Sequence, residues 1–305
     1  MIDVLTPFLD ATVRTATPLA LAALGETLCE RAGVINVGLE GAIIAGCLGA
    51  VVGSAAFGAP AGVVVAAIAG LVVAALFGVI VLTARADQII TGTAITLGAY
   101  GATGVLYPLS FGPGGAALDI PTLGPLATPG LSKLPVIGPA LFGQSILTYL
   151  LFALTFGAWW YLYRTGAGLG WRAVGEHPPA ATAAGINVRR VQWLGVLSSG
   201  VLGGLGGAAL VMQVGTFSEQ MSAGRGFIAL AVVALGRWTP HGALAAALLF
   251  GGATALQYRF QAGGSALPYQ LFVALPYLVT LAVLAGGLGR ARAPGGLGRE
   301  AAFSR

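Results

Sequence analysis

The chain has 305 residues, of which 57% are hydrophobic and only 8% carry a charge. A typical soluble domain has about 25% charged residues, so this composition excludes an ordinary soluble protein and predicts a polytopic membrane protein. The formal net charge is +5, but the basic residues lie at the ends of apolar runs, which indicates membrane topology rather than nucleic-acid binding.

The apolar runs predict a series of membrane helices. A helix needs about 20 apolar residues to cross the hydrocarbon core. Spans are predicted at 5–25, 34–53, 61–83, 88–107, 145–164, 191–213, 226–237, 241–258 and 268–287. The run 226–237 is too short to cross alone and predicts a broken or re-entrant helix. We expect an all-α polytopic membrane bundle of about 8–10 transmembrane helices, forming a single domain over residues 1–290.

Two connecting segments and the tail fix the expected topology. Residues 108–144 contain prolines from Pro108 to Pro139 and form the longest stretch without a helical pattern. Arginine-rich loops stay on the cytosolic side, so Arg85 and Arg164 should lie inside and 108–144 outside. Residues 291–305 are expected to form a disordered cytosolic tail. The side of the N-terminus depends on the number of crossings, which the sequence leaves open.

The polar stretch between the fifth and sixth spans predicts a docking segment. Arg172, Arg189 and Arg190 place it in the cytosol, and Pro178 can start a short helix over residues 180–184. A short helix held at the cytosolic face is suited to docking onto another subunit. The expected coupling loop is 165–190, with contact residues Arg172, Gly175, Glu176, His177, Pro178, Ala180, Ala181, Ala184, Gly185 and Asn187.

Glycine is abundant, with 49 residues, and it marks two kinds of feature. Gly200, Gly203, Gly204 and Gly207 share one helical face, which favours close helix packing over substrate contact. The glycine-broken segments 32–41 and 223–232 are weakly alike. Transporters are often built from internal repeats whose interrupted helices flank the substrate path, so a repeat is possible here.

A few polar side chains inside the apolar segments are candidates for a substrate pathway. Ionisable groups at membrane depth are costly and face a cavity or a partner. Asn36 and Glu40 share a face if their segment is helical. From that face they could equally well contact a polar substrate or brace the broken helix. The threonines also have the alternative role of bonding their own helix carbonyls. The candidates are Asn36, Glu40, Asp87, Gln88, Thr91 and Thr96.

The sequence shows no catalytic or metal-binding constellation. His177 and His241 are isolated, and Cys29 and Cys47 lack metal-ligand spacing. A phosphate-binding P-loop needs Gly-Lys-Ser/Thr, but the only lysine, Lys133, follows Ser132. If transport uses ATP, a separate subunit must hydrolyse it.

Several motifs resemble one family over nearly the whole chain. They are GETLCERAGVINVGLEG (25–41), ADQIITG (86–92), GLGWRAVGEHPPAATAAGINVRR (168–190), SAGRGFIALAVVALGRWTPHGA (222–243) and LPYLVTLAVLA (275–285). The chain resembles the permease subunits of bacterial ABC importers of the nucleoside and simple-sugar type, in the branched-chain amino acid and ribose permease superfamily. It departs from the family pattern at Asp87 and Thr96, where Asn is common, and at His177-Pro178-Pro179, where Asn-Pro-Glu is usual.

The resemblance implies a transport subunit of the bacterial cytoplasmic membrane with no enzymatic activity, no metal and no cofactor of its own. It implies three partners: a second permease subunit in a heterodimer, a cytosolic ATPase with two fused nucleotide-binding domains that uses ATP and Mg²⁺, and an extracytoplasmic substrate-binding lipoprotein. Nucleosides or related ribosyl compounds are the expected substrates. The alternatives are a simple-sugar or branched-chain amino acid ABC permease, then a non-ABC transporter or channel.

Overall fold

The computed structural model describes residues 2–112, 120–126, 137–262 and 292–298, together with the single residues 270, 274 and 278. This described part consists of helices and connecting segments without strands, which confirms the all-α prediction. The helices are α1 (Ile2–Arg31), α2 (Leu39–Phe57), α3 (Ala59–Gly78), the π-helix η1 (Val79–Thr83), α4 (Gln88–Phe111), α5 (Ile137–Phe142), α6 (Ile146–Arg164), α7 (Gly166–Glu176), α8 (Pro178–Ala183), α9 (Val188–Val214), α10 (Arg225–Leu235) and α11 (Pro240–Ala262).

Long apolar helices form the body of the molecule. Five described segments are long and apolar enough to cross a membrane: α2, α3 with η1, α4, α6 and α9. The spans predicted at 5–25 and 241–258 fall within α1 and α11. The span predicted at 268–287 lies outside the described residues apart from isolated positions. The span predicted at 34–53 starts too early, since residues 34–38 are not helical and α2 begins at Leu39.

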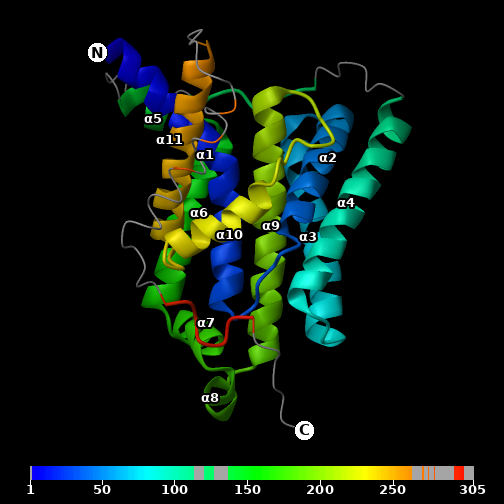
Figure 1. Ribbon diagram of the computed structural model, residues 1–305, viewed down its shortest axis with the longest axis vertical. Coiled ribbons are helices and arrows are strands. Elements are labelled where there is room, and N and C mark those ends of the chain that lie inside the picture. The colour runs from blue at the N-terminus through cyan, green and yellow to red at the C-terminus, as the bar shows by residue number, and fades with distance from the viewer. Residues whose placement is uncertain are drawn as a thin grey trace.

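α9 is the central helix and packs against α1, α2 and α3 (Figure 1). Its glycines allow these helices to approach closely. A Cβ at Gly204 would lie 2.2 Å from the Ala66 carbonyl oxygen of α3, and one at Gly207 would lie 2.3 Å from the Ile43 carbonyl oxygen of α2. The predicted packing role of this glycine face is therefore confirmed.

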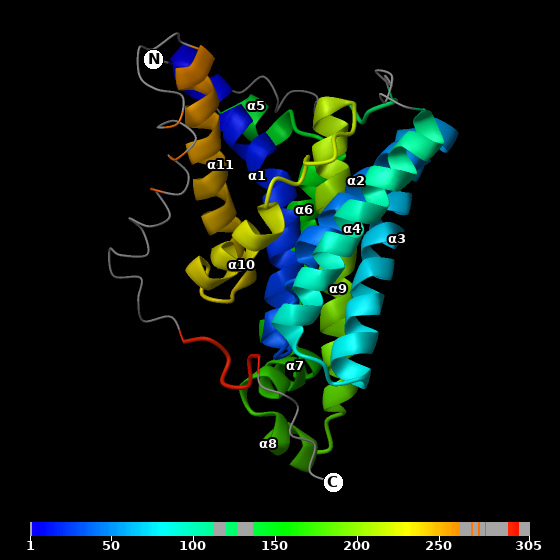
Figure 2. The same cartoon turned by 45° about the vertical axis from the view of Figure 1, so that its right-hand side comes forward.

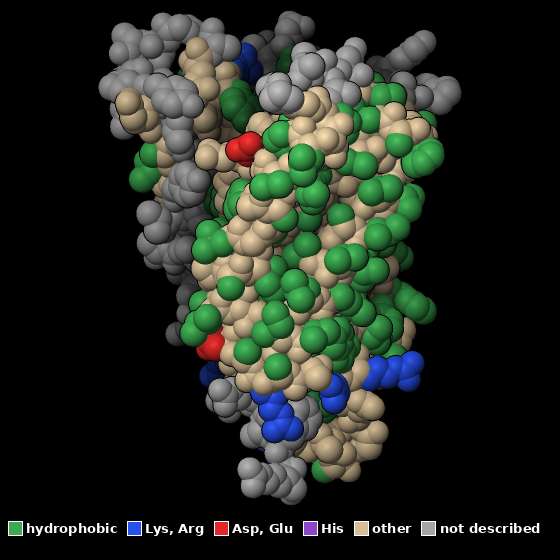
Figure 3. Space-filling view, turned by 90° about the vertical axis from the view of Figure 1, so that its right-hand side faces the viewer, with side chains coloured by type: hydrophobic (Ala, Val, Ile, Leu, Met, Phe, Trp, Pro, Cys, Tyr) green, Lys and Arg blue, Asp and Glu red, His purple; other side chains and the backbone are tan. Residues whose placement is uncertain are grey.

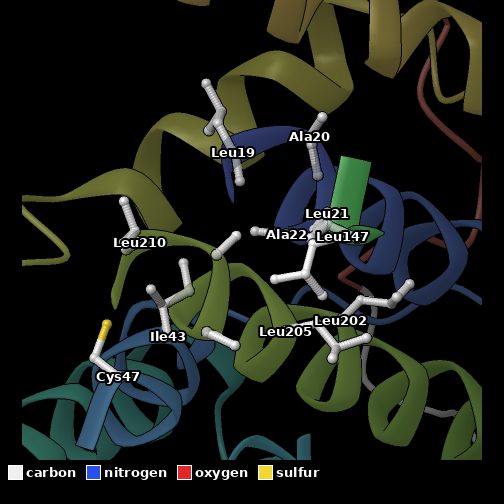
Figure 4. Packing of buried hydrophobic residues seen from close by; sticks show 14 of the residues in the cluster. Leu19, Ala20, Leu21, Ala22, Ile43, Cys47, Leu147, Leu202, Leu205 and Leu210 are labelled. Carbon is white, nitrogen blue, oxygen red and sulfur yellow. The ribbon is translucent and has the colours of Figure 1, made fainter. Parts of the chain in front are cut away.

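The main hydrophobic core lies where α9 meets α1 and α2. Figure 4 shows Leu21 and Leu147 beside Leu202 and Leu205, with Ile43 on the facing helix. Burial of aliphatic side chains fixes the relative positions of the helices that carry the polar groups described below.

α10 is a broken membrane helix, as its short apolar run predicted. It lies obliquely at mid-height of the bundle, and α11 then runs back toward the end where α1 begins (Figures 1 and 2). The connection from α9 to α10 reaches into the bundle without helical structure over residues 215–224. A second non-helical entry, residues 32–38, precedes α2.

The outer face of α3 and α4 is apolar and ends at a basic rim. Val64, Ile68, Val72 and Leu76 expose more than half of their surface along one side of α3. In Figure 3 the hydrophobic side chains cover this face, and Lys and Arg side chains gather below them, at the end of the molecule that carries α7 and α8. Arg189 lies at this end and donates to Thr83 (3.0 Å).

The structure differs from the sequence-based expectation in four places. α4 continues through Pro108 to Phe111, and α5 lies inside the segment 108–144 that was expected to be non-helical. α7 occupies the first half of the expected loop 165–190, because Thr165 caps its first turn (accepting from Gly168, 3.0 Å) and Trp171 and Val174 are buried. Residues 292–298 belong to the tail for which disorder was expected, and they make defined contacts with Gly33 and Gly175.

Candidate functional site

The first break, residues 32–38, is a non-helical segment held by side chains of neighbouring helices. The Ile35 amide donates to the Gln88 side chain of α4 (2.9 Å), and the Asn36 amide donates to the Glu26 carboxylate of α1 (2.8 Å). Thr96 lies 3.5 Å from the Val37 carbonyl. Non-helical backbone at membrane depth must have its polar groups satisfied by protein. These polar side chains are the hydrogen-bond partners of the backbone of the break.

Asn36 lies at the centre of the first break and is fully buried. Its amide nitrogen donates to the Ser199 hydroxyl of α9 (2.6 Å), about three turns into that helix from Val188. Asn36 Oδ1 and Glu26 Oε2 have no hydrogen-bond partner among the described residues. Asn36 therefore ties the break to α9 deep inside the bundle.

Glu40, the second residue of α2, binds the start of α10. Its Oε1 accepts from the Gly224 amide (2.8 Å) and from the Tyr100 hydroxyl (2.6 Å), and its Oε2 accepts from the Gly226 amide (2.5 Å). The side chain is 1% exposed. The N-terminus of a helix carries partial positive charge and free amide donors. The buried carboxylate thus caps α10 and joins the start of α2 to the start of α10, within the two segments whose sequences are weakly alike.

Four of the six predicted pathway residues lie in the first break, directly after it or against it. Asn36 belongs to it, Glu40 follows it at the start of α2, and Gln88 and Thr96 contact it from α4. Thr91 is a buried residue of α4. Asp87 is separate, because its carboxylate caps α4 by accepting from the Ile89 and Ile90 amides. The side chains of Glu40 and Gln88 thus accept hydrogen bonds from backbone amides, Glu40 from Gly224 and Gly226 and Gln88 from Ile35.

A cavity with a mixed polar and apolar lining lies elsewhere, between α1, α9, α10 and α11. Its volume is about 440 Å³, and its polar lining includes Arg14, Thr15, Gln213, Arg225, Thr254 and Gln257. The sequence analysis did not select these residues as pathway candidates, since they come from four helices that are distant from one another in the sequence. The one available signal was an amide side chain inside an apolar helix, as at Gln213 and Gln257. Gln213 also donates to the Arg14 carbonyl (2.9 Å) and so links α9 to α1.

Most of the predicted coupling residues lie in an exposed turn around α8, whereas Gly175 and Ala181 are buried. His177 caps α8 by accepting from the Ala180 amide (3.1 Å), Pro178 begins the helix, and Ala181 is its buried contact. Glu176, Ala180 and Ala184 are exposed. Gly185 has φ +79°, which favours glycine, and Asn187 caps α9. Arg172 lies 4.8 Å from the centre of the Tyr163 ring.

This turn is packed directly onto the end of α1. A Cβ at Gly175 would lie 2.2 Å from the Arg31 carbonyl oxygen. The Arg31 guanidinium in turn donates to the Trp238 carbonyl (2.5 Å), and the Trp238 indole donates to Glu30. The end of α1 therefore connects the α7–α8 turn with the turn between α10 and α11.

The fold and these contacts define a membrane transport protein, because interrupted helices that meet inside an apolar bundle are typical of transporters. Among the described residues, no group of His, Cys, Asp and Glu side chains could hold a metal ion. The family described as the branched-chain amino acid transport system permease component matches residues 8–284. The chain belongs to this permease family.

Relatives match the chain over nearly its full length. The chain is 38% identical to the guanosine ABC transporter permease protein NupQ of Bacillus subtilis, over 96% of each chain. It is 38% identical to the nucleoside ABC transporter permease protein NupC of Lactococcus lactis, over 92% of this chain and 91% of that one. The putative glucose ABC transporter permease protein TsgC13 of Haloferax volcanii is 34% identical over 90% of each. No solved structure shows a significant match.

The family assignment confirms that the chain is a multi-pass membrane protein and a transport component rather than an enzyme. An ABC permease works with an ATPase, which is a separate subunit, and with a substrate-binding partner.

Proposed function

We propose that the chain is the permease subunit of an ABC importer that moves nucleosides, or related ribosyl compounds, into the cytoplasm. The observation that carries this proposal is the 38% identity to a guanosine permease across 96% of both chains. A simple sugar is the second candidate, favoured by the 34% identity to the putative glucose permease. A branched-chain amino acid is disfavoured, since the two acids considered for its path, Glu40 and Asp87, already cap helices.

The substrate is tested by uptake of labelled nucleosides, ribose and glucose in cells with and without this subunit. Nucleoside uptake that depends on the subunit, with no such dependence for ribose or glucose, is the expected result. Dependence of sugar uptake alone would replace the first candidate with the second.

The proposed pathway combines the cavity with the two breaks. Gln213, Gln257 and Thr254 offer neutral donors and acceptors suited to ribose hydroxyls and base edges, and Phe250 adds an apolar surface. Asn36, Glu40, Gln88, Thr91 and Thr96 shape this path by holding the breaks, and Asp87 fixes the entry to α4.

The proposed assembly places α7 and α8 in the cytosol of a bacterial cell. The basic rim at this end supports the orientation, with Arg164 at the end of α6 and Arg189 at the start of α9. Residues 292–298 lie at the same end, so the C-terminal part is cytoplasmic. The partners are a second permease subunit in a heterodimer, an ATPase with two fused nucleotide-binding domains that uses ATP and Mg²⁺, and an extracytoplasmic lipoprotein that delivers the substrate.

The proposed mechanism follows the contacts inward from α8. Movement of the ATPase displaces α8, and the close contact between Gly175 and Arg31 carries the displacement to the end of α1. From there it reaches the first break through Gly33 and reaches α10 through Trp238. The two breaks move with respect to each other around Glu40, which alternates access to the path.

A charged side chain on the exposed face of α8 should prevent docking. Ala183 is exposed, and we expect Ala183→Glu to reduce both retention of the ATPase subunit and uptake by about 30-fold, the effect of losing a contact worth 2 kcal/mol. Co-purification of the ATPase and uptake by the reconstituted complex measure this.

The matched control is Ser110→Glu, an exposed position near the end of α4 farthest from α8. Its ATPase retention should equal that of the parent protein. Unaltered uptake by Ala183→Glu would show that the ATPase does not dock at α8.

A further inference from the structure

A short segment near the C-terminal end crosses the junction between the coupling helices and the first break. Residues 292–298 follow the surface beside α7 (red in Figures 1 and 2). Pro294 and Gly296 are buried, although Arg292 and Ala293 on one side and Gly298 on the other are exposed. We name residues 294–298 the clip.

The clip is hydrogen-bonded to both sides of the junction. The Gly296 amide donates to the Gly175 carbonyl at the end of α7 (2.8 Å), and the Gly298 amide donates to the Gly33 carbonyl at the start of the first break (3.2 Å). Leu297 packs against the main hydrophobic core, and its amide closes a turn onto Pro294 (3.0 Å). One compact turn therefore holds two segments that are distant in the sequence.

The fit between the clip and α8 is close enough to transmit a displacement. A Cβ at Gly296 would lie 2.8 Å from the Cδ of Pro178, the first residue of α8, and 2.9 Å from the Gly175 carbonyl oxygen. The backbone at Gly298 is in the left-handed region (φ +67°), which glycine adopts more readily than other residues. On its other side, a Cβ at Gly298 would contact Ile35 inside the break at 3.2 Å.

We infer that the clip is a positioning segment, which couples movement of α8 to movement of the first break. The inference rests on the proposed docking of the ATPase at α8. Backbone bonds to Gly175 and Gly33 keep the two segments in one register, so that a push on α8 displaces residues 33–38 and not only the surface turn. Without the clip, ATP hydrolysis would continue while less of it produced transport.

The experiment uses the complete transporter reconstituted in liposomes and compares Gly296→Val with Ala293→Val. Position 293 is exposed, so its variant controls for added bulk in the same segment. ATPase retention, ATP hydrolysis and substrate uptake are measured for each. Gly296→Val is expected to retain the ATPase and its hydrolysis but to lower uptake per ATP hydrolysed by about tenfold, as the loss of one or two hydrogen bonds predicts. Ala293→Val should match the parent.

A chain ended after residue 291 provides the second variant, because it removes the clip without introducing a collision. It should show the same fall in uptake per ATP if Gly296→Val fails to fold. If Gly296→Val or the shortened chain transports as much substrate per ATP hydrolysed as the parent protein, the coupling role of the clip is wrong. Loss of the ATPase subunit from either variant would also overturn it, because the segment would then be a docking surface. Undiminished ATPase retention in Ala183→Glu would instead overturn the proposed docking at α8.

Discussion

Replacement of Glu40 by alanine is expected to lower the free energy of unfolding by roughly 3 kcal/mol or more and to abolish uptake. The change removes the acceptor for the Gly224 and Gly226 amides and the Tyr100 hydroxyl. Each buried donor left without a partner costs about 1–3 kcal/mol. Denaturant unfolding of the detergent-solubilised protein measures the first effect, and uptake in proteoliposomes measures the second.

Two further variants sharpen this test. Glu40→Gln keeps one acceptor oxygen but directs an amide donor at a backbone donor, so its stability should lie between those of Glu40→Ala and the parent. Glu219→Gln changes an exposed acid of the α9–α10 connection and should leave stability and uptake unaltered. Equal stability of Glu40→Ala and the parent would contradict the role of Glu40 as the cap of α10.

The second large effect is expected for Gly175→Ala at the end of α7. The new Cβ would lie 2.2 Å from the Arg31 carbonyl oxygen and 3.3 Å from the Gly33 amide nitrogen, both of them backbone atoms. Overpacking of this kind costs about 1–3 kcal/mol. Because the collision separates α7 from α1, uptake should also fall. Thermal unfolding and uptake by the reconstituted complex measure these two effects.

Gly170→Ala is the control in the same helix. Its Cβ would meet only the Ile186 Cδ1 atom at 3.5 Å, and alanine favours a helix over glycine by about 1 kcal/mol. The control should be as stable as the parent or slightly more stable. If both alanine variants unfold at the parental temperature, the contact between α7 and α1 is not as close as described.

The sequence predicted the helices well because apolar length is a local property. The predicted spans 88–107 and 145–164 lie within or nearly coincide with α4 and α6. α4 extends beyond its predicted end at residue 107, because Pro108 lacks only one backbone hydrogen-bond donor and a membrane helix tolerates that loss. The following turn is still closed, since the Gly112 amide donates to the Pro108 carbonyl (2.8 Å). α7 was missed because its polar and glycine residues concealed the buried spacing of Trp171 and Val174.

The candidate site could be predicted only in part. Polar residues in apolar segments identified Asn36, Glu40 and Gln88, which hold the first break or the helix start that follows it. Their partners could not be predicted, because each bond joins residues that lie far apart in the chain. The weak similarity of residues 32–41 and 223–232 predicted two broken segments, but the second break lies at 215–224, because residues 225–232 are helical in α10. Only the structure shows that one carboxylate joins the starts of α2 and α10.

The side chains that hold the first break limit where substrate specificity could be altered by mutation. Glu26, Gln88 and Asn36 each use one polar atom to hold the backbone of the break or a neighbouring helix, so variation there would alter folding before selectivity. Gln257 and Thr254 line the cavity from a single helix face. A library built to retune specificity should therefore vary α11 and leave the start of α2 unchanged.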